Sequence, residues 1–264
     1  HPGPPAYAGG PAEGAGSCVL PPRRIALRTL LVMLNPLAGK GKALRALDVI
    51  LPIFEGAGIR AEVFRTQAAG DVRRMAQQRD LRSFDAVCVL GGDGTIAEAL
   101  GGLMARADGF KLPIAIVPCG TGNSFAADFG RNRATPEQSA RSIVQGNVRQ
   151  ADSAWMELGP VSGVHFMNMV DWPADYVKRA ESMRWMGPAR YNVAATMEIM
   201  GGRLGRHVRM IIDEEVIETF VMIIHVQNNK FCGDEMLAAP AARIDDGLLD
   251  MFFIPKLGKA ALLG

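Results

Sequence analysis

The stretch DAVCVLGGDGT, residues 85–95, decides the fold of this chain. Five apolar residues in a row, 86–90, predict a strand that is buried on both faces, as in a parallel sheet. The strand runs into a turn where three glycines surround one acid, Asp93. Glycine permits left-handed backbone conformations and lets backbone N–H groups approach an anion closely. The stretch therefore predicts a strand, an anion-binding turn and a helix in succession.

The same succession repeats on both sides of this stretch, from residue 25 to residue 147. Thr135 followed by Pro136, for example, is a typical helix start. The expected strands cover 25–34, 59–66, 85–90 and 113–117, and the expected helices cover 43–58, 69–84, 95–107 and 135–147. Buried strands that alternate with helices indicate a parallel sheet covered on both faces. We therefore expect an α/β domain over residues 25–147.

The pattern changes near residue 148. Strand-like runs now follow one another, and a single helical insertion, roughly 174–202, interrupts them. The residues IIDEEV, 211–216, are typical of a hairpin tip. The expected strands cover 150–158, 165–170, 207–213, 215–229 and 248–254. Successive strands without crossover helices indicate an antiparallel sheet or sandwich, so we expect a β-sandwich domain over residues 148–264.

The two ends of the chain differ from its middle. Residues 1–24 are rich in Pro, Gly and Ala without apolar periodicity, and we expect a disordered leader there. The last residues, KLGKAALLG (256–264), are expected to begin a helix that is cut short. We therefore expect the second domain to be incomplete and the chain to be a fragment.

The composition narrows the possible functions. The formal net charge of +2 is too small to attract nucleic acid through a global field. No apolar stretch approaches the ~18 residues of a membrane-spanning helix. Cys18, Cys88, Cys119 and Cys232 form no C-x-x-C pair, and we interpret them as buried free thiols of a reducing compartment. We expect a cytoplasmic protein without a nucleic-acid partner or a transmembrane segment.

Three glycine-rich turns follow strands of the expected parallel sheet. They are NPLAGKGK (35–42), GGDGT (91–95) and GTGNS (120–124). Because ligands bind at the carboxyl ends of parallel strands, all three turns are expected at the same edge, with a helix N-terminus behind each and with Lys40 and Lys42 as cations. The spacing fits neither a P-loop nor a dinucleotide fingerprint, and zinc and serine-hydrolase motifs are absent from the sequence. A phosphate or nucleotide site is the remaining prediction.

Four segments together resemble the diacylglycerol kinase and sphingosine kinase family of lipid kinases. They are NPLAGKGKA (35–43), GGDGTIAEAL (91–100), VPCGTGNSFAADFG (117–130) and APAARIDDGLLDMFFI (239–254). The resemblance implies an α/β nucleotide domain, a C-terminal β-sandwich and ATP in the cleft between them. GGDGT by itself also occurs in NAD kinases, so an NAD kinase-like enzyme remains an alternative.

The family resemblance also implies roles for individual residues. Asp93 takes the position of the base that accepts the proton of the substrate hydroxyl, although it would also suit the cap of a helix beginning near Thr95. The implied nucleotide-binding residues are Asn35, Pro36, Lys40, Thr66, Gly91, Gly92, Gly94, Thr95, Glu98, Gly120, Thr121 and Asn123. Within ESMRWMGPAR (181–190), Arg184 and Arg190 take the positions of two phosphate-binding arginines; exposed helix arginines are the alternative.

A metal site follows from the same resemblance. In ARIDDGLLD (242–250), Asp246 would bind a structural Mg²⁺ with its carboxylate, together with the backbone carbonyls of Arg243 and Leu248. A hairpin turn built on Asp-Gly is the alternative interpretation.

Two departures from the family pattern affect the expected activity. Sphingosine kinases carry an acid for the substrate amine, but Val177 occupies that position, and Asp175 lies two residues earlier. The late Asp-Gly-Glu motif of the family is absent from these 264 residues. Sphingosine is thus in doubt as the substrate, and either the chain is cut before the motif or catalysis is lost.

The leading expectation is an ATP- and Mg²⁺-dependent kinase that phosphorylates a hydroxyl of a long-chain lipid, a sphingoid base or diacylglycerol, taken from a membrane surface by peripheral association. The alternatives are an NAD kinase-like enzyme and a nucleotide-binding regulatory module without catalysis. Residues 167–200 are rich in Met and Trp, which suits either an acyl-chain pocket or ordinary core packing.

Overall fold

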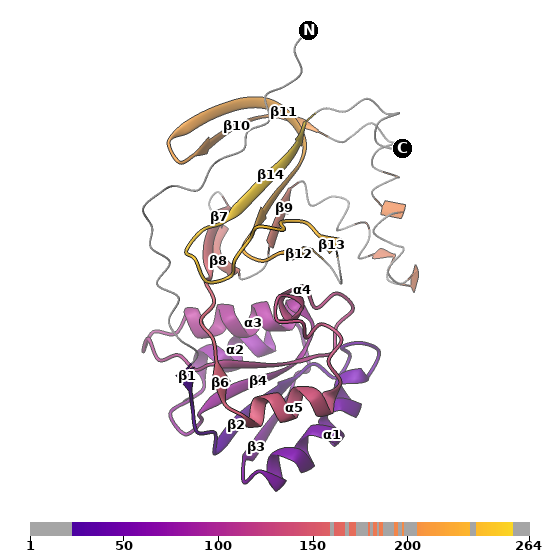
Figure 1. Cartoon of the computed structure of the whole chain (residues 1–264), viewed down its shortest axis with the longest axis vertical. Helices are drawn as coiled ribbons and strands as arrows, with labels where there is room; N and C mark the ends of the chain where they lie inside the picture. Colours follow the sequence, from indigo (N-terminus) through magenta and orange to yellow (C-terminus); the bar gives the residue numbers. More distant parts are fainter. Residues whose placement is uncertain are drawn as a thin grey trace.

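The computed structural model describes residues 23–158, 161–166, 169–172, 205–232 and 236–255, and isolated positions between 179 and 197. An α/β part lies below and antiparallel strands lie above it (Figure 1). This arrangement confirms the predicted fold class. The predicted leader, up to residue 22, lies outside the described residues.

The α/β part is built on a four-stranded parallel sheet with the strand order β3-β2-β4-β5. Its strands are β2 (Thr29–Leu34), β3 (Arg60–Arg65), β4 (Ala86–Gly91) and β5 (Ile114–Pro118). β2 and β4 are the central strands and are almost entirely buried, as their unbroken apolar runs predict. All four strands run in the same direction, so their carboxyl ends share one edge.

Helices cover both faces of this sheet. The helices are α1 (Lys42–Gly56), α2 (Asp71–Gln78), α3 (Asp93–Met104) and α5 (Pro136–Val144). Side chains of β2 alternate between two cores: Leu30, Val32 and Leu34 pack with α1 and α5, whereas Leu31 and Met33 pack with α2 and α3. The period of two along the strand thus builds the two layers.

A buried arginine joins the end of α2 to the segment after α3. The Arg106 guanidinium donates to the carbonyl oxygens of Ala76 (2.9 Å) and Arg79 (2.8 Å), and it binds both carboxylate oxygens of Asp108 at 2.9 and 2.7 Å. The hydrogen bond from Arg106, assisted by the Phe110 N–H, lowers the pKa of the Asp108 carboxyl to about 2. Arg106 thereby satisfies carbonyl groups that the helix end leaves open.

This pair predicts an acid-sensitive component of stability. Because the pKa of Asp108 falls from 3.8 to about 2 on folding, its contribution is complete above pH 4 and disappears as the pH falls towards 2. Asp108→Asn should therefore reduce stability at pH 5 and lessen the further loss between pH 5 and pH 2.5. Urea unfolding at the two pH values measures this difference. If wild type and variant lost the same free energy of unfolding between pH 5 and pH 2.5, the prediction would be contradicted.

Three short elements of the α/β part were not predicted from the sequence. β1 (Arg23–Arg24) pairs antiparallel with β6 (Asn147–Val148), so the last two residues of the predicted leader belong to the fold. Helix α4 (Ser124–Ala127) follows the GTGN turn. By contrast, the predicted start of α5 is confirmed, since Thr135 and Gln138 form a reciprocal capping box.

Among the described residues, the antiparallel part contains one larger sheet and two small hairpins. Its strands are β7 (Ala154–Leu158), β8 (Val161–Phe166), β9 (Met169–Trp172), β10 (Arg206–Ile212), β11 (Glu215–Gln227), β12 (Phe231–Cys232), β13 (Met236–Leu237) and β14 (Asp250–Pro255). β11 is the central strand and pairs with β10, β9 and β14. The predicted hairpin tip is present, because Asp213 and Glu214 join β10 to β11 with positive φ angles.

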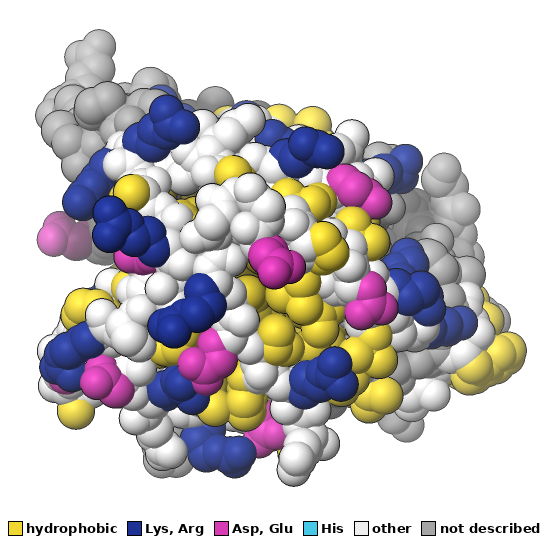
Figure 2. All heavy atoms as spheres, turned by 90° about the horizontal axis from the view of Figure 1, so that it is seen from below, with side chains coloured by type: hydrophobic (Ala, Val, Ile, Leu, Met, Phe, Trp, Pro, Cys, Tyr) yellow, Lys and Arg dark blue, Asp and Glu magenta, His cyan; other side chains and the backbone are white. Residues whose placement is uncertain are grey.

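The surface carries charges of both signs. On the face seen from below, Lys and Arg side chains are interspersed with Asp and Glu, and hydrophobic atoms gather near the middle (Figure 2). None of the helices in the described part of the chain combines the length and the apolar composition that crossing a bilayer requires.

Of the cysteines, Cys88 and Cys119 are buried free thiols as predicted, and Cys232 is half-buried. Burial raises the pKa of Cys88 to about 12 and that of Cys119 to about 11, which makes both unreactive.

Candidate functional site

The three glycine turns meet at the carboxyl edge of the parallel sheet. Gly92 and Gly120 touch backbone to backbone: a Cβ on Gly120 would lie 2.5 Å from the Gly92 Cα, and a Cβ on Gly92 would lie 2.9 Å from the Gly120 Cα. Gly39, in the first turn, packs against the carbonyl oxygen of Cys119 with a φ of 58°. Glycine is therefore required by contacts between turns, as well as within each turn.

Asn123 holds the GTGN turn in shape. Its backbone lies in the left-handed region with a φ of 51°, and the residue is 6% exposed. Its Oδ1 accepts from the Gly120 N–H at 3.0 Å, while its Nδ2 donates to the carbonyl oxygens of Gly120 (3.1 Å) and Asn132 (3.3 Å). The amide is thus engaged with the turn itself, so Asn123 shapes the site through the backbone.

Asp93 connects the GGDGT turn to helix α4. Its carboxylate accepts from the Ser124 N–H at 3.0 Å and from the Phe125 N–H at 3.1 Å. Asp93 caps a helix, as the alternative interpretation expects, but the helix is α4. It does not cap the helix that follows GGDGT, because α3 begins at Asp93 itself. The acid in the glycine turn therefore has a fixed position set by two backbone donors.

The GGDGT turn combines a packed side with an open side. A Cβ on Gly91 would lie 2.5 Å from the Thr95 Cβ, so Thr95 closes the space beneath the turn. Gly94 is exposed, and a Cβ there would have no neighbour within 4 Å in the described structure. Open space over bare backbone is the arrangement that an anionic ligand needs at a helix start.

Other predicted residues lie at the ends of neighbouring strands. Asn35 follows β2, and its Oδ1 accepts from the Leu37 N–H at 2.9 Å, while Pro36 is half-buried beside it. Thr66 follows β3 and donates its N–H to the Leu34 carbonyl at 3.0 Å. Asn35, Pro36 and Thr66 thus share the edge of the sheet with the glycine turns.

Glu98 lies on α3, three residues after Thr95, and it contacts the loop before α2. Its Oε1 accepts from the Gly70 N–H at 3.0 Å, and Gly70 is the residue before α2. The side chain therefore ties α3 to the loop after Thr66 in this structure. This hydrogen bond from the Gly70 N–H helps to hold the loop before α2 against α3.

A pocket of about 650 Å³ opens beside the GTGN turn. It is lined by Gly120 and Thr121 and by the cations Lys42, Arg45 and Arg133. Lys40 lies nearby in the first turn, exposed and with a φ of 55°. Sequence reasoning missed Arg45 and Arg133. Arg45 follows Lys42 by three residues on a helix, a spacing that would have placed both on one face.

The antiparallel part reaches the α/β part at helix α4. The Asn229 Nδ2 donates to the Ser124 carbonyl oxygen at 3.1 Å, and the Lys230 N–H donates to both carboxylate oxygens of Asp128, at 3.1 and 3.3 Å. Burial raises the pKa of Asp128. In Figure 1, β12 and β13 accordingly lie directly above α4.

Gln227 presents an unsatisfied amide in this buried region. It is fully buried at the end of β11, and neither its Oε1 nor its Nε2 has a hydrogen-bond partner within the described part of the chain. An unpartnered buried polar group costs about 1–3 kcal/mol.

Replacing Gln227 with Met should therefore stabilise the protein. Met has a similar volume without the amide, and we expect the free energy of unfolding to rise by about 1 kcal/mol. Urea unfolding of wild type and Gln227→Met measures the change, with Gln78→Met, at an exposed position, as a neutral control. A loss of stability in Gln227→Met would show that the amide is bonded in solution.

The predicted metal segment forms an acidic turn before β14. Asp246 Oδ1 accepts from the Leu248 N–H at 3.1 Å, and the neighbouring Asp245 pairs instead with Arg243 at 3.4 Å. Burial and, secondarily, the charge of Asp246 raise the pKa of Asp250. Two carboxylates that repel each other suit a hard cation, although the described residues include no group of three His, Cys, Asp or Glu side chains placed to hold a metal.

Several predicted residues lie outside the described residues. These are Asp175, Val177, Arg184 and Arg190. From the Met- and Trp-rich stretch, the structure describes Trp185 as 81% exposed and Met197 as 47% exposed, so these two side chains are not core.

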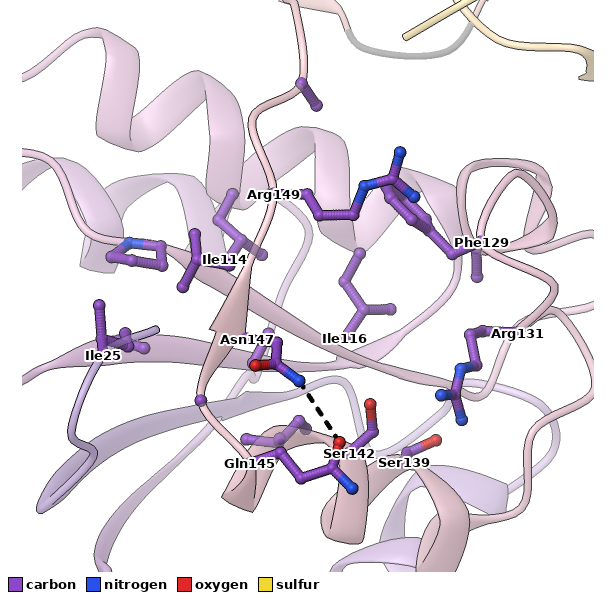
Figure 3. Close-up of a pocket in the computed structure, with 18 of the residues that line it drawn as sticks. Ile25, Ile114, Ile116, Phe129, Arg131, Ser139, Ser142, Gln145, Asn147 and Arg149 are labelled. Atoms are coloured by element: carbon purple, nitrogen blue, oxygen red, sulfur yellow. Dashed lines mark hydrogen bonds between the residues drawn. The ribbon is translucent and has the colours of Figure 1, made fainter. Parts of the chain in front are cut away.

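A separate cavity of about 540 Å³ runs along the outer edge of β5 (Figure 3). Ile114 and Ile116 of β5 line this cavity. Gln145 and Asn147 line it too, and the Asn147 Nδ2 donates a hydrogen bond to the Gln145 Oε1 at 3.5 Å. It includes none of the predicted site residues, so the glycine turns remain the candidate site.

Comparison with known families matches both parts of the chain. Residues 29–156 match the family described as the diacylglycerol kinase catalytic domain. Residues 171–264 match the family described as the YegS C-terminal NAD kinase beta sandwich-like domain.

Individual relatives agree with these families. The chain is 26% identical to sphingosine kinase 1 of Arabidopsis thaliana over 89% of its own length, and it spans only 58% of that relative. It is 27% identical to diacylglycerol kinase of Bacillus subtilis (strain 168), covering 88% of this chain and 75% of the relative. A crystal structure of a diacylglycerol kinase from Bacillus anthracis str. Sterne superposes with a TM-score of 0.72 at 26% identity, covering 90% of this chain and 77% of the other.

Proposed function

The chain belongs to the diacylglycerol kinase and sphingosine kinase family, and we propose that it transfers the γ-phosphoryl group of ATP to a hydroxyl of a long-chain lipid. The observation that carries the proposal is the meeting of three glycine turns around Asp93. Phosphoryl transfer requires positioning, cations and one acceptor for the hydroxyl proton, and this edge of the sheet offers all three.

The turns would hold the phosphates of ATP. The open backbone at Gly94 and the start of α3 offer N–H donors and a favourable helix dipole to an anion. Lys40 and Lys42 supply positive charge from the first turn and α1. Asn35, Pro36 and Thr66 would contact the nucleotide, and Gly91, Gly92, Thr95, Gly120, Thr121 and Asn123 would build the turns. Arg184 and Arg190 would add bidentate contacts to the phosphates.

Asp93 would accept the proton of the lipid hydroxyl. A carboxylate oxygen has more than one lone pair, so an oxygen that accepts from Ser124 or Phe125 can still accept from a substrate hydroxyl. The two N–H groups fix the orientation of the carboxylate, which keeps the acceptor in place while ATP and lipid bind.

The acidic turn before β14 would be the site of a Mg²⁺ ion. Asp246 would hold it with a carboxylate oxygen, together with the backbone carbonyls of Arg243 and Leu248. When bound, such an ion supplies a fixed positive charge that neutralises the local carboxylates. Asp246 itself ties this turn together by accepting from the Leu248 N–H.

A neutral lipid alcohol, such as diacylglycerol, suits the sequence better than a sphingoid base. Val177 offers no charge to an amine, and Asp175 would serve only with a different local backbone. The lipid would come from a membrane surface by peripheral association of a cytoplasmic protein. A second candidate function, NAD phosphorylation, is favoured by the NAD kinase-like description of residues 171–264. A nucleotide-binding regulatory module without catalysis is the remaining alternative.

An assay with γ-labelled ATP tests the proposal. Diacylglycerol, sphingosine and NAD are offered separately to the protein, the lipids in mixed micelles. Label in a lipid is the expected result. Label in NAD alone would replace the lipid kinase with the second candidate, and ATP binding without transfer to any of the three would favour the regulatory module.

A further inference from the structure

Helix α4 is held from two sides by different parts of the molecule. From the α/β side, the Asp93 carboxylate accepts the N–H groups of Ser124 and Phe125. From the antiparallel side, the Asn229 Nδ2 donates to the Ser124 carbonyl oxygen at 3.1 Å, and this bond is buried. Ser124 is therefore bonded through its N–H to Asp93 and through its carbonyl to Asn229.

The contact made by Asn229 is well defined. Asn229 is fully buried, and its Nδ2 bonds the Phe231 carbonyl at 3.2 Å in addition to Ser124. The next residue, Lys230, bonds Asp128, which follows the last turn of α4. A four-residue helix has little stability of its own, so its position depends on these contacts.

We propose that Asn229 is a positioning residue for Asp93, acting from the antiparallel part through helix α4. The inference rests on the proposed role of Asp93 in phosphoryl transfer. Asn229 fixes Ser124, and Ser124 with Phe125 fixes the carboxylate that would take the hydroxyl proton. Because a shift of about 1 Å in a catalytic group can reduce the rate ~100-fold, losing this contact should slow transfer without removing the nucleotide site.

Asn228 provides a matched control. It is 1% exposed, and its Nδ2 donates to the Asp152 carbonyl at 3.0 Å, whereas that of Asn229 donates to Ser124 of α4. Asn228→Leu and Asn229→Leu therefore each replace a buried amide of the same size with an apolar side chain. Both should lower the melting temperature by similar amounts, so a difference in activity cannot come from stability alone.

The kinetic test compares these variants with labelled ATP and a micellar lipid. We expect Asn229→Leu to lower kcat about 10- to 100-fold with the KM for ATP within about twofold, and Asn228→Leu to keep kcat within about threefold. In an Asp93→Asn background, Asn229→Leu should lower the residual kcat less than threefold, because both changes affect the same group. The inference would be overturned if the two Leu variants lowered kcat equally. It would also be overturned if Asn229→Leu lowered kcat as much in the Asp93→Asn background as in wild type.

Hydrogen exchange gives a readout that does not require activity. The amide hydrogens of Ser124 and Phe125 should exchange faster in Asn229→Leu than in Asn228→Leu, and faster in Asp93→Asn than in wild type. If wild type transfers no phosphate but the exchange pattern is as expected, the proposed function fails, while the dependence of the Asp93–α4 hydrogen bonds on Asn229 is supported. Unchanged exchange in Asn229→Leu would refute this dependence, and Asn229→Ser repeats the test if the Leu variant does not fold.

Discussion

Gly120→Ala is expected to lower the free energy of unfolding by about 3 kcal/mol and to abolish measurable ATP binding. The added methyl group would lie 2.5 Å from the Gly92 Cα and 2.8 Å from the Asn123 Oδ1. Backbone cannot rotate away as a flexible side chain can, so the GGDGT and GTGN turns must separate. Urea unfolding and an ATP titration measure the two losses.

Gly94→Ala is the stability control for this prediction. It adds the same methyl group in the same region, but the described structure leaves open space around it. The variant should unfold within about 0.5 kcal/mol of wild type, while ATP affinity should fall if phosphate occupies that space. Equal destabilisation by both substitutions would contradict the contact between the turns.

Asp93→Asn is expected to lower the transfer rate by about 10²- to 10⁴-fold, the usual range for losing a proton acceptor. The amide oxygen can retain one bond to α4, so the loss of stability should be about 1 kcal/mol. The dissociation constant for ATP should stay within about threefold, because the turns themselves are unchanged. Initial rates, equilibrium binding and urea unfolding, measured on one preparation, separate these effects.

Asp85 offers the matched control. Its Oδ2 also accepts two backbone N–H groups, from Arg28 at 2.7 Å and Thr29 at 2.8 Å, but it lies at the amino end of β4, away from the turns. Asp85→Asn should lower the free energy of unfolding by an amount similar to Asp93→Asn and leave the transfer rate unchanged. A comparable loss of rate in both variants would mean that Asp93 acts only as a structural cap.

The sequence predicted most of the α/β part because its signals are local. Continuous apolar runs such as 86–90 identify buried strands, and Thr135 with Pro136 marks a helix start that the capping box confirms. The partner of Asp93 could not be predicted, because it lies about thirty residues away in a helix of one turn. The bond between Asn229 and Ser124 spans 105 residues and leaves no periodic pattern in the sequence.

Hydrogen exchange with and without ATP tests most directly whether the three turns form one nucleotide site. We expect ATP to slow exchange together in residues 35–42, 91–95 and 120–124, while the hairpin tip at 213–214 is unaffected. Slower exchange in only one of the three turns, or in none of them, would contradict the account.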